Sequence, residues 1–254
     1  MAELSIKTMG AGRALVMLHG WGMHGGIWGS ITTRLAQQFQ LHIVDLPGHG
    51  RSSLEGEFTL DRVVERLAAS LPEEAIWLGW SLGGRIAMAA AVAGVPISRL
   101  ILVGANPCFT KREGWSHGMD DELLGQFAEQ LRDDCRATLL RFLVLQSRGS
   151  EQGREEMRTL RGELFSRGEP TPAALAGGLE VLRHADLRAD LSRINQPTLV
   201  IQGENDTLAP LGAGEYTCSE IPTAQLSVIA GAGHAPFLSH PDAFIAAIKE
   251  FLSD

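Results

Sequence analysis

The chain has 254 residues, of which 44% are hydrophobic and 20% are charged, and its formal net charge is −8. This composition is typical of a globular protein and excludes a fibrous, coiled-coil or disordered chain, while the length fits one α/β domain with an insertion. The negative charge argues against nucleic-acid binding as the main function, because proteins that bind the phosphate backbone normally present a basic domain or stripe.

Short apolar runs alternate with helix-like segments over the first hundred residues. The runs at 14–18, 41–44, 75–78 and 100–103 have the continuous apolar character of buried parallel strands. Between them, residues 28–38, 60–70 and 82–93 carry helix-spaced apolar positions, and Thr59 can cap the second of these helices. The alternation predicts an α/β fold with a mostly parallel sheet and flanking helices.

The alternation stops at residues 106–107 and resumes at Pro197. Strands are predicted at 198–201 and 226–229, followed by an amphipathic helix at 241–252 that has proline in its first turn. The residues between are mostly helical and polar in pattern, with no strand signal. We therefore predict an α/β core formed by residues 1–107 and 187–254, and an inserted helical cap, residues 108–186, over one end of the sheet.

Part of the cap is basic. Residues 132–161 contain seven arginines and five acidic residues, a net charge of +2 in a chain of −8. Arg154, Arg158 and Arg161 are spaced to lie along one face of a helix. Ion pairs with neighbouring glutamates would give this spacing a purely structural role, and binding of an acidic partner would give it a functional one.

Features for membrane insertion, secretion and metal binding are weak. The longest uncharged apolar stretch, residues 86–98, is shorter than the ~20 residues of a spanning helix. The first residues lack the pattern of a secretory signal, so we expect a cytosolic protein. The cysteines, Cys108, Cys135 and Cys218, are odd in number and lack C-x-x-C spacing, which indicates reduced packing residues. The histidines show no metal-ligand spacing, so we expect no metal.

Residues 79–83 read Gly-Trp-Ser-Leu-Gly, between a predicted strand and a predicted helix. This is the structural context of the G-x-S-x-G nucleophile elbow, in which a strained turn lifts the serine hydroxyl above the sheet. The alternative is a glycine-rich turn with an incidental serine. Ser81 is the predicted nucleophile.

A serine hydroxyl needs a base and an orienting carboxylate. In the chain order of this fold, Asp206 follows the strand at 198–201 and His234 follows the last strand, so both would lie at carboxyl ends of strands with Ser81. Glu204 remains an alternative acid. Asp45 also ends a strand, but its turn-rich loop suggests a structural role.

Two backbone N–H groups are predicted to bind the oxyanion of the reaction. Leu82 follows the nucleophile directly and supplies one. The loop after the first strand supplies the other, from Trp21 in the sequence His19-Gly20-Trp21-Gly22. The same residues could also simply form a tight turn at the end of the strand, and the two interpretations are compatible.

These motifs, with residues 45–52 (Asp-Leu-Pro-Gly-His-Gly-Arg-Ser) and 233–237 (Gly-His-Ala-Pro-Phe), resemble the α/β-hydrolase superfamily over the whole chain. More narrowly, residues 106–109, 141–146, 177–182 and 186–188 resemble the family of pimeloyl-[acyl-carrier protein] methyl ester esterases of biotin synthesis. The resemblance implies a serine carboxylesterase that removes the methyl ester of a dicarboxylic acyl chain held by an acyl-carrier protein, and releases methanol.

The resemblance also implies a set of binding residues. Substrate contacts fall on Trp21, Ser81, Leu82, Phe142, Leu143, Val144, Leu145, Gln146 and His234. Carrier-protein contacts fall on Arg141, Arg154 and Arg158. The family has one more arginine for carrier contact; the corresponding position in this chain is Ala137, and Arg136 is the residue before it.

The spacing of Phe142 and Gln146 places them on one helix face, where they could form an apolar wall with one amide. The alternative is a structural role, in which Phe142 packs between two helices and Gln146 is exposed to solvent at the edge of that contact. We predict a monomeric cytosolic esterase without a cofactor. A thioesterase or carbon–carbon hydrolase on the same scaffold, or a hydrolase-like receptor without turnover, remain alternatives.

Overall fold

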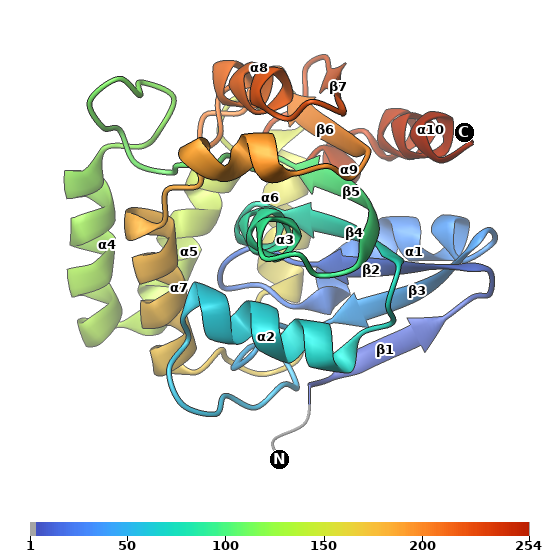
Figure 1. The fold of residues 1–254 in the computed structure, drawn as a ribbon. Coiled ribbons are helices and arrows are strands. Elements are labelled where there is room, and N and C mark those ends of the chain that lie inside the picture. The colour runs from blue at the N-terminus through green and yellow to red at the C-terminus, as the bar shows by residue number, and fades with distance from the viewer. Residues whose placement is uncertain (1–3, 254) are drawn as a thin grey trace.

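The computed structural model describes residues 4–253, and its centre is a seven-stranded sheet with helices on both faces (Figure 1). The strand order is β1-β3-β2-β4-β5-β6-β7, with β1 antiparallel to β3 and all other pairs parallel. The strands are β1 (Ile6–Met9), β2 (Arg13–Leu18), β3 (Phe39–Val44), β4 (Ala75–Trp80), β5 (Ile97–Val103), β6 (Thr198–Gly203) and β7 (Ala224–Ile229).

Helices cover the sheet and fill the connection between β5 and β6. They are η1 (Gly25–Trp28), α1 (Gly29–Leu35), α2 (Leu60–Ser70), α3 (Leu82–Val92), α4 (Asp121–Asp133), α5 (Cys135–Gln146), α6 (Gly153–Glu163), α7 (Pro172–His184), η2 (Arg188–Arg193), α8 (Leu211–Glu220), α9 (Pro236–Ser239) and α10 (Pro241–Leu252). No helix within residues 4–253 is long and apolar enough to cross a membrane.

The predicted parallel sheet is confirmed, because all six apolar runs form strands in it. Several elements were not predicted, among them strand β1 and the helices η2, α8 and α9. Strand β1 is short and polar, and its middle residues Lys7 and Thr8 are exposed, so it lacks a buried apolar run. It pairs with β3 at the edge of the described sheet, where no other strand lies on its second side. Helix α8 also carried no recognised signal.

Helix ends follow local chemistry. The Thr59 hydroxyl accepts a hydrogen bond from the Arg62 N–H and caps α2, as predicted. The helix expected at 28–38 is shorter, because η1 ends at Trp28 and α1 ends at Leu35. Helix α10 begins at Pro241, where the missing N–H of proline costs no intrahelical hydrogen bond.

The cap contains α4 to α7; α4, α5 and α7 lie at the left of Figure 1, and α6 lies near its centre. Its two ends meet, since the Leu187 N–H donates to the Pro107 carbonyl at 2.9 Å. The buried Arg85 on α3 holds both crossings: its guanidinium donates to the Asn106 carbonyl at 3.0 Å and to the Ala185 carbonyl at 2.7 Å.

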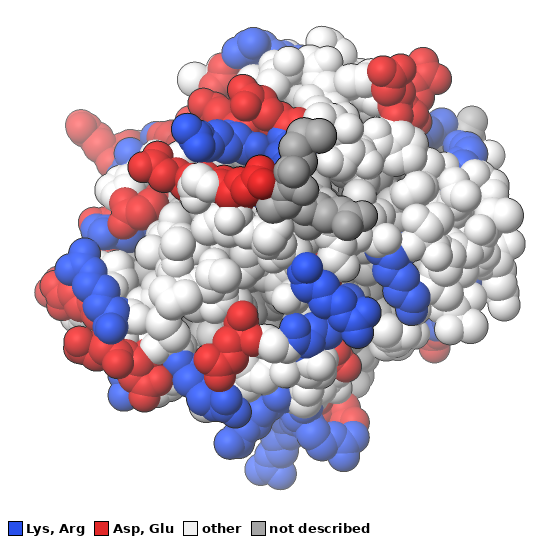
Figure 2. Space-filling model, turned by 90° about the horizontal axis from the view of Figure 1, so that it is seen from below, with Lys and Arg blue, Asp and Glu red and all other residues white. Residues whose placement is uncertain are grey.

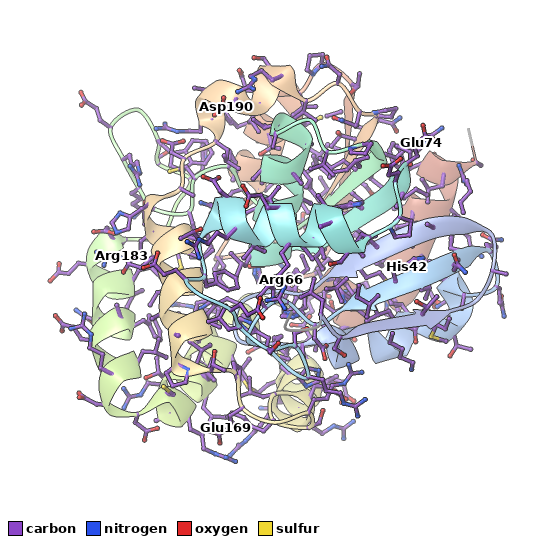
Figure 3. All side chains as sticks on the ribbon, turned by 60° about the horizontal axis from the view of Figure 1, so that its bottom comes forward. His42, Arg66, Glu74, Glu169, Arg183 and Asp190 are labelled. Carbon is purple, nitrogen blue, oxygen red and sulfur yellow. The ribbon has the colours of Figure 1, made fainter. Side chains whose placement is uncertain are left out.

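Polar contacts within and below the cap fix its position. Figure 3 shows Arg183 of α7 beside α4, where it pairs with Asp121 at 3.1 Å. Toward the core, Arg167 lies 3.2 Å from the buried carboxylate of Asp45. The Thr171 N–H also donates to the Gly48 carbonyl at 2.8 Å. The cap is therefore joined to the core along the loop that follows β3.

Candidate active site

Ser81 stands in a strained turn between β4 and α3. Its φ of 55° and ψ of −116° place a non-glycine residue in a region that side chains disfavour. The turn needs glycine at position 79, because a Cβ there would lie 2.3 Å from the Gly83 carbonyl oxygen. The strand-to-helix context expected for Ser81 is thus present, and the turn holds the hydroxyl at the carboxyl edge of the sheet.

His234 and Asp206 form a hydrogen-bonded chain with Ser81. The Nε2 atom of His234 lies 3.0 Å from the Ser81 hydroxyl oxygen, and its Nδ1 lies 2.8 Å from Asp206 Oδ2. All three residues are buried. The other Asp206 oxygen accepts hydrogen bonds from the N–H groups of Leu208 and Ala209, at 2.8 and 3.0 Å. These donors fix the orientation of the carboxylate.

The alternative acids lie elsewhere. Glu204 accepts a hydrogen bond from the Gly231 N–H at 3.0 Å. Asp45 accepts from the N–H groups of Gly25 and Arg51, at 2.7 and 3.0 Å, in addition to pairing with Arg167. The structure therefore joins Asp206 to His234, and Asp45 stabilises a loop, as its turn-rich surroundings suggested.

The sequence analysis did not predict the roles of three residues that surround the hydrogen-bonded residues Ser81, His234 and Asp206. The Gln202 amide donates to Asp206 Oδ2 at 3.1 Å, and the Trp80 indole donates to the His234 carbonyl at 2.8 Å. Gly104 has φ of 50°, and a Cβ there would lie 3.0 Å from the same carbonyl. A polar glutamine in the otherwise apolar strand β6 was the one usable signal, since buried polar groups need partners.

The backbone of the loop after β2 lies next to Ser81. A Cβ on Gly20 would lie 3.3 Å from the Ser81 Cβ and 3.0 Å from the Trp80 ring. Within residues 4–253, the N–H groups of Trp21 and Leu82 donate to no protein acceptor. The Leu82 N–H belongs to the first turn of α3, directly after Ser81, where backbone donors have no intrahelical partner.

The predicted substrate segment, residues 142–146, lies on α5 and faces the core with only part of its surface. Phe142, Leu143 and Gln146 are buried, Leu145 is half-buried and Val144 is 58% exposed. No protein group in the described chain pairs with either polar atom of the Gln146 amide. The burial of Gln146 removes the alternative in which it is a solvated edge, and the exposure of Val144 places that side chain away from the buried face.

The predicted carrier contacts are exposed on the cap. Arg141 on α5 donates to the Gln130 side chain at 2.7 Å, and Arg158 on α6 pairs with Glu155, one of the ion pairs considered above. Arg136 pairs with Glu169 at 2.8 Å. Figure 2 shows that basic side chains gather in groups in the lower part of the view from below, and acidic ones mainly in its upper and left parts.

Within residues 4–253, no group of three or more His, Cys, Asp or Glu side chains could hold a metal ion. The three cysteines are free, and Cys108 is buried.

The comparisons with known proteins agree on one family. The model of the alpha/beta hydrolase family matches residues 15–247. A pimeloyl-[acyl-carrier protein] methyl ester esterase from Nitrosomonas europaea is 44% identical over 247 residues, which cover 97% of this chain and 98% of that protein. A protein of the same name from Xanthomonas oryzae is 43% identical over 251 residues, covering 98% of this chain and 99% of that protein.

Solved structures show the same fold. A hydrolase from Pseudomonas aeruginosa, 28% identical, has a TM-score of 0.80 and covers 100% of this chain and 95% of its own. An esterase from Exiguobacterium antarcticum, 23% identical, has a TM-score of 0.87 and covers 100% and 96%. At this identity the second match supports the fold alone. The chain belongs to the alpha/beta hydrolase family.

Proposed function

We propose that this protein is a serine carboxylesterase that hydrolyses the methyl ester of pimeloyl-acyl-carrier protein, giving pimeloyl-acyl-carrier protein and methanol in biotin biosynthesis. The observation that carries the proposal is the chain of hydrogen bonds from Ser81 through His234 to Asp206, at 3.0 and 2.8 Å. The substrate is inferred from the relatives, whose name describes this activity and which match this chain along nearly its whole length.

In the proposed mechanism, the Ser81 hydroxyl oxygen attacks the ester carbonyl while His234 Nε2 takes the hydroxyl proton. Asp206 accepts the Nδ1–H of His234, which keeps Nε2 as the proton acceptor and stabilises the imidazolium. The N–H groups of Trp21 and Leu82 bind the oxyanion. The imidazolium then gives its proton to the leaving methoxide, so that methanol departs and an acyl-enzyme remains.

A water molecule completes the turnover. His234 removes a proton from it, and the resulting hydroxide attacks the acyl-enzyme carbonyl. Collapse of the second tetrahedral intermediate breaks the bond to Ser81, whose oxygen regains the proton. The free carboxylate of the pimeloyl chain is the product. Neither step requires a metal or an organic cofactor, and we place the reaction in the cytosol, in a monomeric enzyme.

The cap, for which we propose the boundaries 108–186, supplies the acyl-chain wall. Trp21 from the core and Phe142 from the cap meet edge to face, and Leu143, the next residue of α5, is also buried. The unpaired Gln146 amide offers a hydrogen-bond donor and acceptor to a polar group of the chain. Leu145 borders this wall. The exposed Val144 is left for contact with the carrier side of the substrate.

The carrier protein would dock on the outside of the cap. Acyl-carrier proteins are acidic, so exposed arginines attract them to a chain whose net charge is otherwise repulsive. Arg141, Arg154 and Arg158 are all exposed. Among the described residues, Arg154 has no ion-pair partner, whereas Arg158 would have to leave Glu155 or share it. Within residues 4–253 Arg141 has no ion pair either, but it would have to leave the Gln130 side chain or share it, so Arg154 is the strongest candidate of the three.

Mass spectrometry of methyl pimeloyl carrier protein before and after incubation tests the proposal. We expect a loss of mass equal to the exchange of a methyl group for hydrogen, with methanol released and the carrier thioester intact. Cleavage of the thioester instead would indicate a thioesterase. Binding without any mass change would indicate a receptor. Ser81→Ala is the matched control, since it removes one oxygen atom at the site.

A further inference from the structure

His19 lies at the end of β2, fully buried next to the loop proposed to bind the oxyanion. Its Nε2 atom is 2.9 Å from the Leu46 backbone nitrogen. A backbone N–H can only donate, so Nε2 must accept, and the proton of the neutral ring must sit on Nδ1. The position of the Leu46 N–H thus fixes the tautomer of His19.

The Nδ1–H of His19 donates to the Gly20 carbonyl at 2.8 Å. The Met23 N–H donates to the same oxygen at 3.2 Å. Two donors from different directions hold this carbonyl in one orientation. The ring of His19 therefore connects the loop after β3, through Leu46, to the peptide that joins Gly20 and Trp21.

That peptide carries the proposed oxyanion donor. Because a trans peptide is planar, its N–H points opposite to its C=O, and fixing the Gly20 oxygen also fixes the direction of the Trp21 N–H. The same peptide lies beside Ser81, as the 3.3 Å from a Gly20 Cβ to the Ser81 Cβ shows. We propose that His19 is a positioning residue that aims the Trp21 N–H at the reacting carbonyl oxygen, an inference that rests on the proposed function.

The surroundings of His19 keep the ring neutral. Burial lowers the pKa of His19 well below 6.5, and the neighbouring His49, His24 and Arg167 lower it further, against a smaller opposite effect of the hydrogen bond to Gly20. A protonated ring would lose the hydrogen bond from Leu46. A neutral, doubly hydrogen-bonded ring gives a fixed direction to the peptide, as preorganised oxyanion binding requires.

Two substitutions separate the contacts of the ring. His19→Asn keeps a short amide donor near the Gly20 carbonyl and loses the Leu46 contact. His19→Gln can reach the Leu46 N–H with its carbonyl and loses the Gly20 contact. His49→Gln is the matched control, because it removes another fully buried imidazole, 5.3 Å from His19, that does not contact Gly20.

We expect His19→Gln to lower kcat for the methyl ester by roughly 10- to 100-fold with little change in KM, since a misaimed donor affects the transition state rather than the ground state. The affinity for an arylboronic acid, which forms a tetrahedral adduct with a reactive serine, should fall in parallel. His19→Asn should recover most of kcat, and His49→Gln should keep wild-type kcat.

Wild-type kcat in folded His19→Gln, or equal losses of kcat in His19→Gln and His49→Gln, would overturn the positioning role. Ser81→Ala, assayed in parallel, keeps the two proposals apart, because an active Ser81→Ala enzyme would refute the proposed function itself. If the His19 variants do not fold, ¹⁵N NMR of the wild-type His19 ring decides. The proposal requires a neutral ring with the proton on Nδ1 at the pH of the kinetic assay, and any other state excludes it.

Discussion

The indole of Trp21 meets the phenyl ring of Phe142 edge to face, with centroids 4.9 Å apart and an interplanar angle of 72°. Phe142 makes a second such contact with Phe127 on α4, at 5.8 Å. The Trp21 indole N–H also donates to the Leu175 carbonyl of α7 at 2.9 Å. One residue of the core loop thus contacts two helices of the cap, beside the proposed oxyanion donor.

Phe142→Ala should weaken both the cap and the substrate site. Loss of a buried phenyl ring costs about 3–5 kcal/mol of unfolding free energy where neighbours cannot fill the space. We also expect KM for methyl pimeloyl carrier protein to rise. Thermal unfolding and steady-state kinetics measure the two effects. Leu123→Ala, at an exposed position of the cap helix α4, should change neither by much, and equal effects of both substitutions would contradict the assigned wall.

Ser81→Ala should lower ester turnover by ~10⁴-fold or more, because only binding and oxyanion stabilisation remain without the nucleophile. The fold should persist, since Ser81 contributes its backbone N–H to the Val103 carbonyl and that contact survives the substitution. Turnover near the wild-type rate in pure, folded Ser81→Ala protein would refute the mechanism.

Asp206→Asn should cost on the order of 10³- to 10⁴-fold in kcat, because the amide no longer holds His234 in the productive tautomer. Glu204→Gln is the matched control, two residues away with its carboxylate on the Gly231 N–H. Its kcat should stay close to that of the wild type. A larger loss in Glu204→Gln than in Asp206→Asn would reassign the acid.

Arg154→Glu should raise KM for the carrier-bound ester by roughly tenfold at low salt, and by more when combined with Arg158→Glu. Added salt should weaken the wild-type reaction on this substrate, because the Debye length is about 8 Å at 0.15 M. Arg62→Glu, with the same charge change on α2 of the core, is the control.

A small ester such as p-nitrophenyl butyrate separates docking from catalysis. It does not use the outside of the cap, so the Arg154 and Arg158 variants should hydrolyse it at the wild-type rate. Equal losses on both substrates would mean that these arginines stabilise the cap itself.

The protein should lose stability in mild acid because of buried histidines. Burial lowers the pKa of His49 from 6.5 to about 4. The unfolded chain therefore binds a proton that the folded one excludes between these values, so the stabilisation is complete above pH 6.5 and declines as pH falls toward 4. The shift corresponds to roughly 3 kcal/mol.

Chemical denaturation at pH 7 and pH 4.5 measures this effect. His49→Gln should show a smaller difference in unfolding free energy between the two pH values than the wild type. His184→Gln, which replaces an exposed imidazole, should show the full difference. An unchanged difference in His49→Gln would assign the acid sensitivity to other groups.

Continuous apolar runs predicted the sheet because buried parallel strands are apolar on both faces, as the fully buried β4 and β6 illustrate. It missed β1 because an edge strand needs no such run. The order of Ser81, Asp206 and His234 along the chain was readable from motifs at strand ends. The roles of Gln202 and Trp80 could not be predicted from motifs, because they depend on which strands are neighbours in space.

The interior of the cap was the hardest part to predict. Helical spacing put Phe142 and Gln146 on one face, but it could not say whether that face was buried, and only the packing of α5 against the core excludes the solvated glutamine. The partners of Arg85 lie 21 and 100 residues away along the chain, so no local pattern reveals them.

The contacts of Arg85 and the hydrogen bond between Leu187 and Pro107 make the cap a separable insertion in the core. The chain leaves and re-enters the core at one point, and a single guanidinium on the helix that follows Ser81 holds both crossings. Insertions, deletions or whole exchanges between these crossings leave every strand pairing of the sheet unchanged. A chimera that keeps Arg85, Asn106 and Ala185 should therefore accept a foreign segment between them, provided that the segment also supplies partners for Asp45 and the Gly48 carbonyl, which Arg167 and Thr171 now contact.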